Sequence, residues 1–164
     1  MNKTILLAFA TIAFGCSSVK SDISFQKGKD CFWNGHYEEA VVHLNKAIDL
    51  DPSSARSHQQ LAITHERLGN LNLAWEHARK AFSLNSQSPA AFETFSSIFK
   101  TIFKQHHLNG PRKPNAKLLI ETLGVADKYL HNEKGDLKAL YYGPICLYID
   151  DGKLSTTEWL NPVR

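Results

Sequence analysis

The chain has 164 residues, 43% of them apolar, so it can bury the core of one domain or of a compact array of repeats. Its 19 Lys and Arg residues nearly balance 16 Asp and Glu residues, which gives a net charge of +3. The basic residues are scattered, and this argues against a nucleic-acid partner, because nucleic-acid binders usually carry a clustered basic face.

The first 15 residues are expected to be a targeting signal. Lys3 precedes an apolar stretch from Ile5 to Phe14. About ten helical residues span about 15 Å, which is half of a bilayer core of about 30 Å. This length suits the apolar region of a signal peptide and is too short for a transmembrane helix.

The apolar stretch ends at Gly15-Cys16, and these two residues resemble the lipoprotein box of bacterial lipoproteins. The resemblance implies a signal peptide at 1–15, acylation of Cys16 and a lipidated tether at 16–21. In that family a Ser after the Cys, here Ser17, goes with the outer membrane, so the resemblance implies its periplasmic face. Phe14 and the residue before it depart from the box, where Leu followed by a small residue is commoner. The alternative is an ordinary secretory signal cleaved nearby, with no role for Cys16.

After this segment, residues 34 apart in the sequence are alike, which indicates an internal repeat. Small or apolar residues recur at matching positions: Gly28 and Ala62, Gly35 and Gly69, Ala40 and Ala74, Ala47 and Ala81, Leu50 and Leu84.

Each repeat is predicted to form two antiparallel helices. The expected ranges are about 22–34 and 37–50 in the first repeat, and 61–68 and 71–84 in the second. Gly35 ends the first helix, because Gly adopts a left-handed cap conformation at little cost. One helix pair cannot bury its apolar face alone, so neighbouring pairs must stack.

Residues 34–40 (Asn-Gly-His-Tyr-Glu-Glu-Ala) and 47–52 (Ala-Ile-Asp-Leu-Asp-Pro) resemble the consensus of the tetratricopeptide repeat (TPR) family. Residues 68–85 resemble a second copy. The resemblance implies an all-α fold: a right-handed α-solenoid over 22–107, with two clear repeats and a partial third.

The remainder is expected to be helical as well. A loop is predicted at 108–115 from its Gly and Pro content. Helices are then expected at 116–132, 137–149 and 154–160. The segment 116–164 is either a degenerate repeat or a helical C-terminal cap, and the cap is favoured.

The TPR resemblance also implies where a partner would bind, because the first helix of each pair lines a concave groove in that family. Gly28, Cys31 and Tyr37 are assigned to the packed faces, which leaves the neighbouring aromatics Phe32 and Trp33 on the open side. Exposed clustered aromatics often mark binding sites. The alternative is that they pack against the tether or another copy of the chain. The expected groove residues are Phe25, Lys29, Phe32, Trp33, Arg56, Gln59, Ile63 and Arg67.

Some TPR domains hold a C-terminal carboxylate with a Lys/Asn/Arg clamp. The matching positions here do not carry that set, which argues against binding of chaperone tails. They are Phe25, Lys29, Gln60, Ala90 and Thr94.

No metal site, cofactor or catalytic residue is expected. His58 and His65 occupy repeat-packing positions without ligands at suitable spacing beside them. Cys31 and Cys146 are expected to be buried thiols and not a disulfide, because a solenoid keeps its ends apart. No nucleophile elbow, phosphate loop or zinc motif is present, so the chain is not expected to be an enzyme.

These features predict a lipid-anchored scaffold that binds another protein or peptide. In architecture and location it is comparable to pilotins, small TPR lipoproteins that help to assemble the pores of type IV pili and secretion systems. A self-associating structural envelope protein is the alternative. A periplasmic enzyme or metal-binding protein that uses the His-rich positions is a third possibility.

Overall fold

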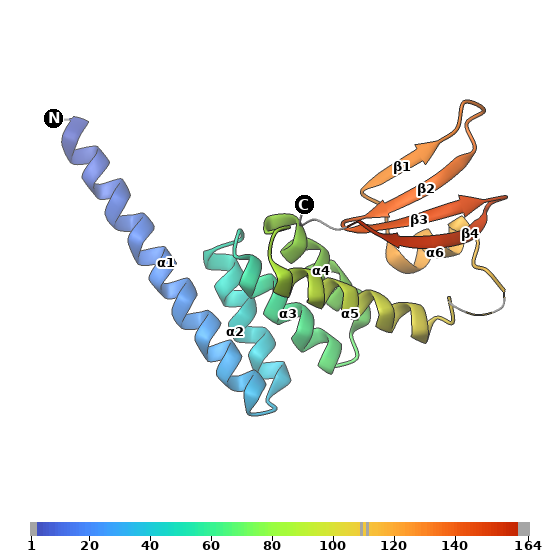
Figure 1. Cartoon of the computed structure of the whole chain (residues 1–164). Helices are drawn as coiled ribbons and strands as arrows, with labels where there is room; N and C mark the ends of the chain where they lie inside the picture. Colours follow the sequence, from blue (N-terminus) through green and yellow to red (C-terminus); the bar gives the residue numbers. More distant parts are fainter. Residues whose placement is uncertain (1–2, 109, 111, 161–164) are drawn as a thin grey trace. The chain divides into compact units, whose positions relative to one another are not determined.

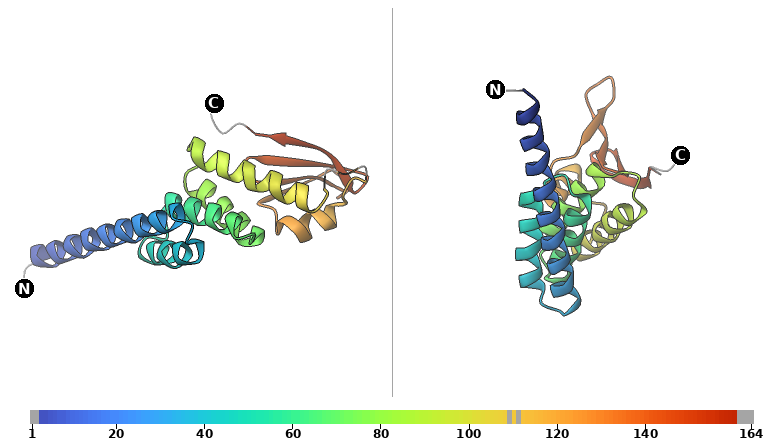
Figure 2. Two further views of the ribbon diagram at one scale, coloured as in Figure 1. Left: turned by 90° about the horizontal axis from the view of Figure 1, so that it is seen from below. Right: turned by 90° about the vertical axis from the view of Figure 1, so that its left-hand side faces the viewer.

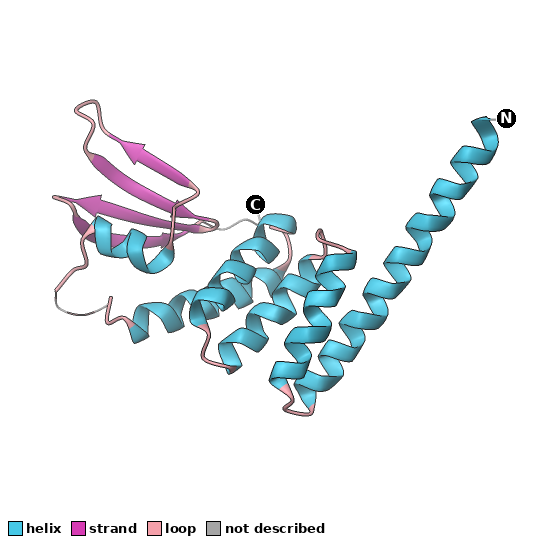
Figure 3. Ribbon diagram, turned by 180° about the vertical axis from the view of Figure 1, so that it is seen from behind, coloured by secondary structure: helices cyan, strands magenta, loops and turns pink. Residues whose placement is uncertain are grey.

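The computed structural model describes residues 3–108, 110 and 112–160, with side chains from residue 18 onward. The chain divides into two compact units, Met1–His77 and Ala78–Arg164, which are described separately below. Helices make up the N-terminal part, and strands occur only in the second unit among the described residues (Figures 1 and 3).

The first unit contains α1 (Lys3–Trp33), α2 (Tyr37–Leu50), α3 (Ala55–Arg67) and the start of α4 (Leu71–Leu84). The bounds of α2 and α4 match the sequence prediction. The helix α1 starts earlier than expected, and its N-terminal part extends beyond α2 (Figure 2). Among the described residues, no helix has the length and apolar content needed to cross a membrane.

The ends of these helices follow from local sequence. Gly35 and Gly69 lie two residues after the ends of α1 and α3 and adopt φ angles of 81° and 76°. Only glycine adopts such angles without strain. The side chain of Ser54 accepts a hydrogen bond from the backbone N–H of Ser57 and so caps the N-terminus of α3. The predicted helix pairs are therefore present.

Small residues bring the helices of the first unit close together. A Cβ added to Gly28 would lie 2.7 Å from Cγ of Leu44, which is fully buried. The hydroxyl of Ser21 donates a hydrogen bond of 3.0 Å to the carbonyl of Ala47, and this bond also joins α1 to α2. The alanines at the matching repeat positions are fully buried: Ala40, Ala47, Ala62 and Ala74.

The second unit contains the end of α4, two further helices and a sheet, so the predicted all-α fold is wrong. The helices are α5 (Pro89–Gln105) and α6 (Ala116–Leu123). The strands β1 (Lys128–His131), β2 (Leu137–Tyr142), β3 (Ile145–Asp150) and β4 (Lys153–Trp159) form one antiparallel sheet in the order β1-β2-β3-β4. The helices expected at 137–149 and 154–160 are therefore strands, and the one expected at 116–132 ends at Leu123.

Turn residues explain why this segment forms hairpins. Gly143 and Pro144 separate β2 from β3, and a Pro inside a helix would remove a backbone hydrogen bond. Asp151 and Gly152 connect β3 to β4 with φ angles of 48° and 70°. Positive φ at both central residues is the geometry of a type I′ hairpin turn, for which Asp-Gly is a preferred sequence.

Aromatic side chains fill the core of the second unit. The rings of Phe82 and Phe95 are 5.6 Å apart, and the ring of Trp159 meets that of Phe99 edge-on at 5.5 Å. A Cβ at Gly143 would lie 3.2 Å from Phe82. The turn between β2 and β3 therefore packs directly on the aromatic core.

The strand β1 forms one of the two edges of the sheet. All four of its residues are exposed, and its pairing with β2 shifts register between Leu130 and His131. It is also the shortest strand of the sheet.

Candidate functional site

The eight predicted groove residues all lie on α1 and α3 of the first unit, and we call them the repeat face. The structure places them as follows: Phe25, Lys29, Phe32 and Trp33 on α1, and Arg56, Gln59, Ile63 and Arg67 on α3.

Two cationic side chains of the repeat face lie over the aromatic ring of a third residue, Phe25. The guanidinium of Arg56 lies 4.7 Å from the centre of the Phe25 ring, and the ammonium of Lys29 lies 5.9 Å from it. Arg56 also forms an ion pair with Asp22. Asp22 and Arg56 are 34 residues apart, so the pair links equivalent positions of consecutive repeats.

The adjacent aromatics at the end of α1 have different environments. Trp33 is 75% exposed, as expected. Phe32 is only 9% exposed and belongs to a core cluster with Ala40, Leu44 and Leu61, so its expected place on the open side is wrong. Consecutive helical residues point about 100° apart, so both cannot face the same way.

The remaining residues of the repeat face divide between core and surface. Ile63 is half-buried and packs against the same core cluster as Phe32. Arg67 is exposed, and Gln59 is half-buried. The surface that a partner could reach therefore consists of an exposed indole and cationic side chains.

Three histidines of the first unit lie together, as repeat-packing residues. His58 and His65 are both buried, which confirms their predicted packing role. Nδ1 of His58 lies 3.1 Å from Nδ1 of His77, and the rings of His65 and His77 stack at 5.8 Å. Burial, followed by the proximity of His58 and His65, lowers the pKa of His77 to about 4. His77 is therefore neutral at pH 7.

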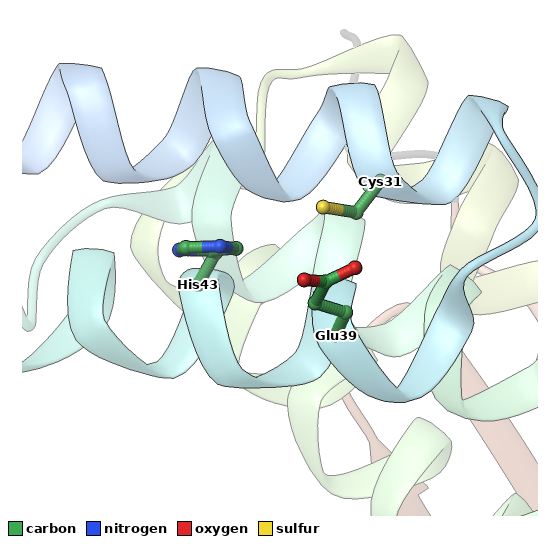
Figure 4. Close-up of side chains that lie close together, drawn as sticks. All are labelled: Cys31, Glu39 and His43. Atoms are coloured by element: carbon green, nitrogen blue, oxygen red, sulfur yellow. The ribbon is translucent and has the colours of Figure 1, made fainter.

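A second group of polar side chains was not anticipated from the sequence. Cys31 of α1 faces Glu39 and His43 of α2, and their ligand-capable atoms all lie within 4.8 Å of one another (Figure 4). Glu39 is exposed, while Cys31 and His43 are half-buried. Nδ1 of His36 lies 3.7 Å from Oε2 of Glu39. The i, i+4 spacing of Glu39 and His43, with a Cys on the partner helix, was the signal available in the sequence.

The described cysteines are unpaired. Cys31 and Cys146 are both free thiols, as predicted. Cys146 is buried, but Cys31 is partly exposed and not buried as expected. Cys16, the predicted lipidation site, lies outside the residues whose side chains are described.

Comparison with known sequences places a repeat in the first unit. Residues 28–69 match the TPR repeat family. A 77-residue segment is 34% identical to the type IV pilus assembly protein PilF of Pseudomonas aeruginosa and covers 47% of this chain and 31% of that protein. Over an alignment of 142 residues, the chain is 23% identical to the Sol locus transcriptional repressor of Clostridium acetobutylicum, and the match covers 77% of this chain and 43% of that protein. The chain spans less than half the length of these curated relatives.

Solved structures of TPR domains are similar to the helical part of this chain. The first TPR of Spaghetti (RPAP3), bound to the HSP90 peptide SRMEEVD, is 25% identical with a TM-score of 0.51 and covers 54% of this chain and 71% of that one. The Arabidopsis OM64 TPR domain is 18% identical with a TM-score of 0.51 and covers 65% and 96%, respectively. The chain therefore contains a TPR, a module that binds proteins or peptides and is typically non-catalytic.

Proposed function

We propose that the chain is a protein-binding scaffold of the bacterial cell envelope that helps to assemble a pilus, secretion or other outer-membrane complex. Its TPR supports the binding role. The 34% identity to a type IV pilus assembly protein supports the assembly role. The observation that carries the proposal is the large exposed indole of Trp33 on the repeat face.

The chemistry of the repeat face suits a peptide or protein surface. The Trp33 ring meets the buried Phe32 ring edge-on at 5.5 Å, and this contact restrains the indole. A restrained aromatic loses little entropy when it binds, and Trp and Arg dominate binding energy in many interfaces. The exposed guanidinium of Arg67 adds hydrogen-bond donors in a planar fork. A fitting partner has an apolar side chain flanked by carboxylate or carbonyl oxygens.

The binding proposal is tested by site-specific photocrosslinking in intact cell envelopes. A crosslinking amino acid replaces Trp33 in one variant and Val42 in the control. Val42 is an apolar residue on α2 that is 66% exposed and outside the repeat face. We expect a heterologous adduct at position 33 only. Equal adducts at both positions would refute the repeat face, and adducts with the chain itself alone would favour a self-associating structural protein.

The strength of the contact is tested by Trp33→Ala once the crosslinked partner is purified. Truncation of an interface hot spot costs roughly 2–4 kcal/mol, so we expect an affinity loss of about 30- to 1000-fold. Val42→Ala is the matched control and should leave affinity unchanged. An unchanged affinity for Trp33→Ala would remove this residue from the binding site.

The envelope location rests on the lipoprotein box at Gly15-Cys16. We propose that Cys16 is acylated and anchors the chain to the periplasmic face of the outer membrane. Each buried methylene contributes about 0.8 kcal/mol, so two or three acyl chains hold a protein stably. Metabolic labelling with a palmitate analogue should mark the wild-type chain and not Cys16→Ser. Equal labelling of both would refute the lipid anchor.

A further inference from the structure

We propose that Cys31, Glu39 and His43 form a binding site for a divalent transition metal ion, and that the best-matched ion is Zn²⁺. We call these residues the α1–α2 trio. The site goes beyond the scaffold function, since none of its members belongs to the repeat face.

The arrangement of the helices brings the trio together. Glu39 and His43 are four residues apart, so they share one face of α2. Cys31 projects from the antiparallel α1 toward them (Figure 4). The close approach at Gly28 and Leu44 and the hydrogen bond from Ser21 hold the two helices side by side. Ligands on packed helices are more accurately placed than ligands on loops.

The distances within the trio fit one bound ion after small side-chain rotations. Zinc bonds are about 2.3 Å to sulfur and about 2.0 Å to nitrogen or oxygen, so tetrahedral ligand atoms lie roughly 3.3–3.8 Å apart. The trio atoms lie within 4.8 Å of one another without an ion. Three protein ligands leave a fourth position for water or for a partner side chain.

The donor types select the metal class. A thiolate and an imidazole favour Zn²⁺ and other borderline or soft ions, whereas Mg²⁺ and Ca²⁺ prefer oxygen ligands. Zn²⁺ has no geometric preference from its d electrons, so it accepts an irregular site. His36, 3.7 Å from the Glu39 carboxylate, is placed to orient that ligand from outside the trio.

The surroundings of Cys31 favour its protonated thiol when no cation is bound. Desolvation, followed by the negative charges of Glu39 and Asp30, raises the pKa of the Cys31 thiol. A divalent cation reverses this effect by bonding to the thiolate. The thiol S–H bond breaks, an S–metal bond forms and one proton is released to solvent.

The test uses the full chain with Cys16→Ser, so that an unacylated thiol does not compete for metal. Titration with Co²⁺ should give a sulfur-to-cobalt charge-transfer band in the near ultraviolet, saturating at one ion per chain, and Zn²⁺ should displace it. Cys31→Ser should remove the band. Glu39→Gln should weaken affinity at least about tenfold.

The matched controls are residues of the same type outside the trio. Glu38→Gln changes an exposed carboxylate directly beside Glu39, and His106→Gln changes an exposed imidazole in the second unit. Both should leave metal affinity within about twofold, whereas His43→Gln should lower it like Glu39→Gln. Circular dichroism checks that each variant remains helical, and the conclusion is drawn from those that do.

Three outcomes would overturn the proposal. The first is the absence of saturable Co²⁺ binding. The second is a charge-transfer band that survives in Cys31→Ser, because the thiolate would then be another cysteine. The third is an equal loss of affinity in Glu38→Gln and Glu39→Gln, which would indicate nonspecific binding to surface acids. None of these outcomes would alter the photocrosslinking result at position 33, so the two proposals fail independently.

Discussion

The two compact units bury their interiors in different ways. In the first unit, Gly28 and fully buried alanines allow the helices to pack closely, so these contacts leave no room for larger side chains. In the second unit large aromatic rings fill the core, so its packing depends on their presence. We therefore expect added atoms at the helix contacts of the first unit to be destabilising, although its core also contains the Phe32 ring. In the second unit we expect the largest losses when aromatic atoms are removed. The aromatic set is Phe82, Phe95, Phe99, Phe103 and Tyr142, all buried.

The largest effect is expected from Phe95→Ala in the second unit. Phe95 is fully buried and contacts Phe82, so its truncation leaves a cavity that costs about 3–5 kcal/mol. Urea unfolding measures the loss. Leu118→Ala on α6, an exposed position, should change stability by no more than about 0.5 kcal/mol. A loss below about 1 kcal/mol for Phe95→Ala would show that the aromatic core is not what stabilises this unit.

The second prediction separates the adjacent aromatics of α1. Phe32→Ala should destabilise the chain by about 3 kcal/mol, because this ring is part of the core cluster. Trp33→Ala should stay within about 0.5 kcal/mol, because its indole is exposed. Thermal unfolding by circular dichroism ranks the two variants. Equal losses would place both rings in the core and remove Trp33 from the surface that a partner could reach.

The third prediction tests whether added atoms disturb the first unit. Gly28→Ala should cost about 1–2 kcal/mol, because the clash with Leu44 outweighs the better helix propensity of Ala, worth about 1 kcal/mol. A double-mutant cycle isolates the clash. In a Leu44→Ala background the obstruction is gone, so Gly28→Ala should become neutral or stabilising. A cost that persists there would contradict the close helix approach.

The smallest effect is expected from the stacked histidines of the first unit. The folded-state pKa of His77 is about 4, below the usual 6.5, so the unfolded chain binds this proton more readily. The contribution of neutral His77 to the free energy of unfolding is complete above pH 6.5 and is lost as pH falls from 6.5 toward 4. His77 is half-buried, so after allowance for solvent screening the loss is about 1 kcal/mol.

His77→Gln provides the comparison for this pH dependence, because an amide does not titrate. The variant should show a flatter stability profile between pH 6.5 and 4, measured by urea unfolding at each pH. A profile as steep as that of the wild-type chain would assign the pH dependence to other groups.

The helical part of the fold was accessible from the sequence because its signals are periodic. The small residues recur every 34 positions, and Gly35 and Gly69 mark the helix ends, so α2 and α4 were placed correctly. The ion pair between Asp22 and Arg56 follows the same interval. The helix-ending glycines and the 34-residue interval predict the same helix boundaries, so the secondary structure of this segment can be predicted from its sequence.

The sheet was missed because short apolar runs are ambiguous. Residues 137–142 and 145–150 are each only six residues long, and helix and strand cannot be separated by periodicity over that length. Gly143-Pro144 and Asp151-Gly152 are the deciding signals, because a Pro cannot continue a helix and Asp-Gly is a preferred pair in two-residue hairpin turns. Phe32 was misplaced for a different reason. It lies four residues after the tightly packed Gly28, so both residues share one face of α1, and this spacing was the overlooked signal.

The edge strand β1 has a consequence for how the chain behaves at high concentration. An exposed sheet edge offers unpaired backbone groups to the edge of another molecule. Here the edge is short, begins with a lysine and has an irregular register at Leu130 and His131, and each of these features opposes strand addition. Tyr129 and Leu130 still expose apolar surface on it. Lys128 therefore adds a charge that opposes strand addition at a position where the edge also exposes apolar side chains.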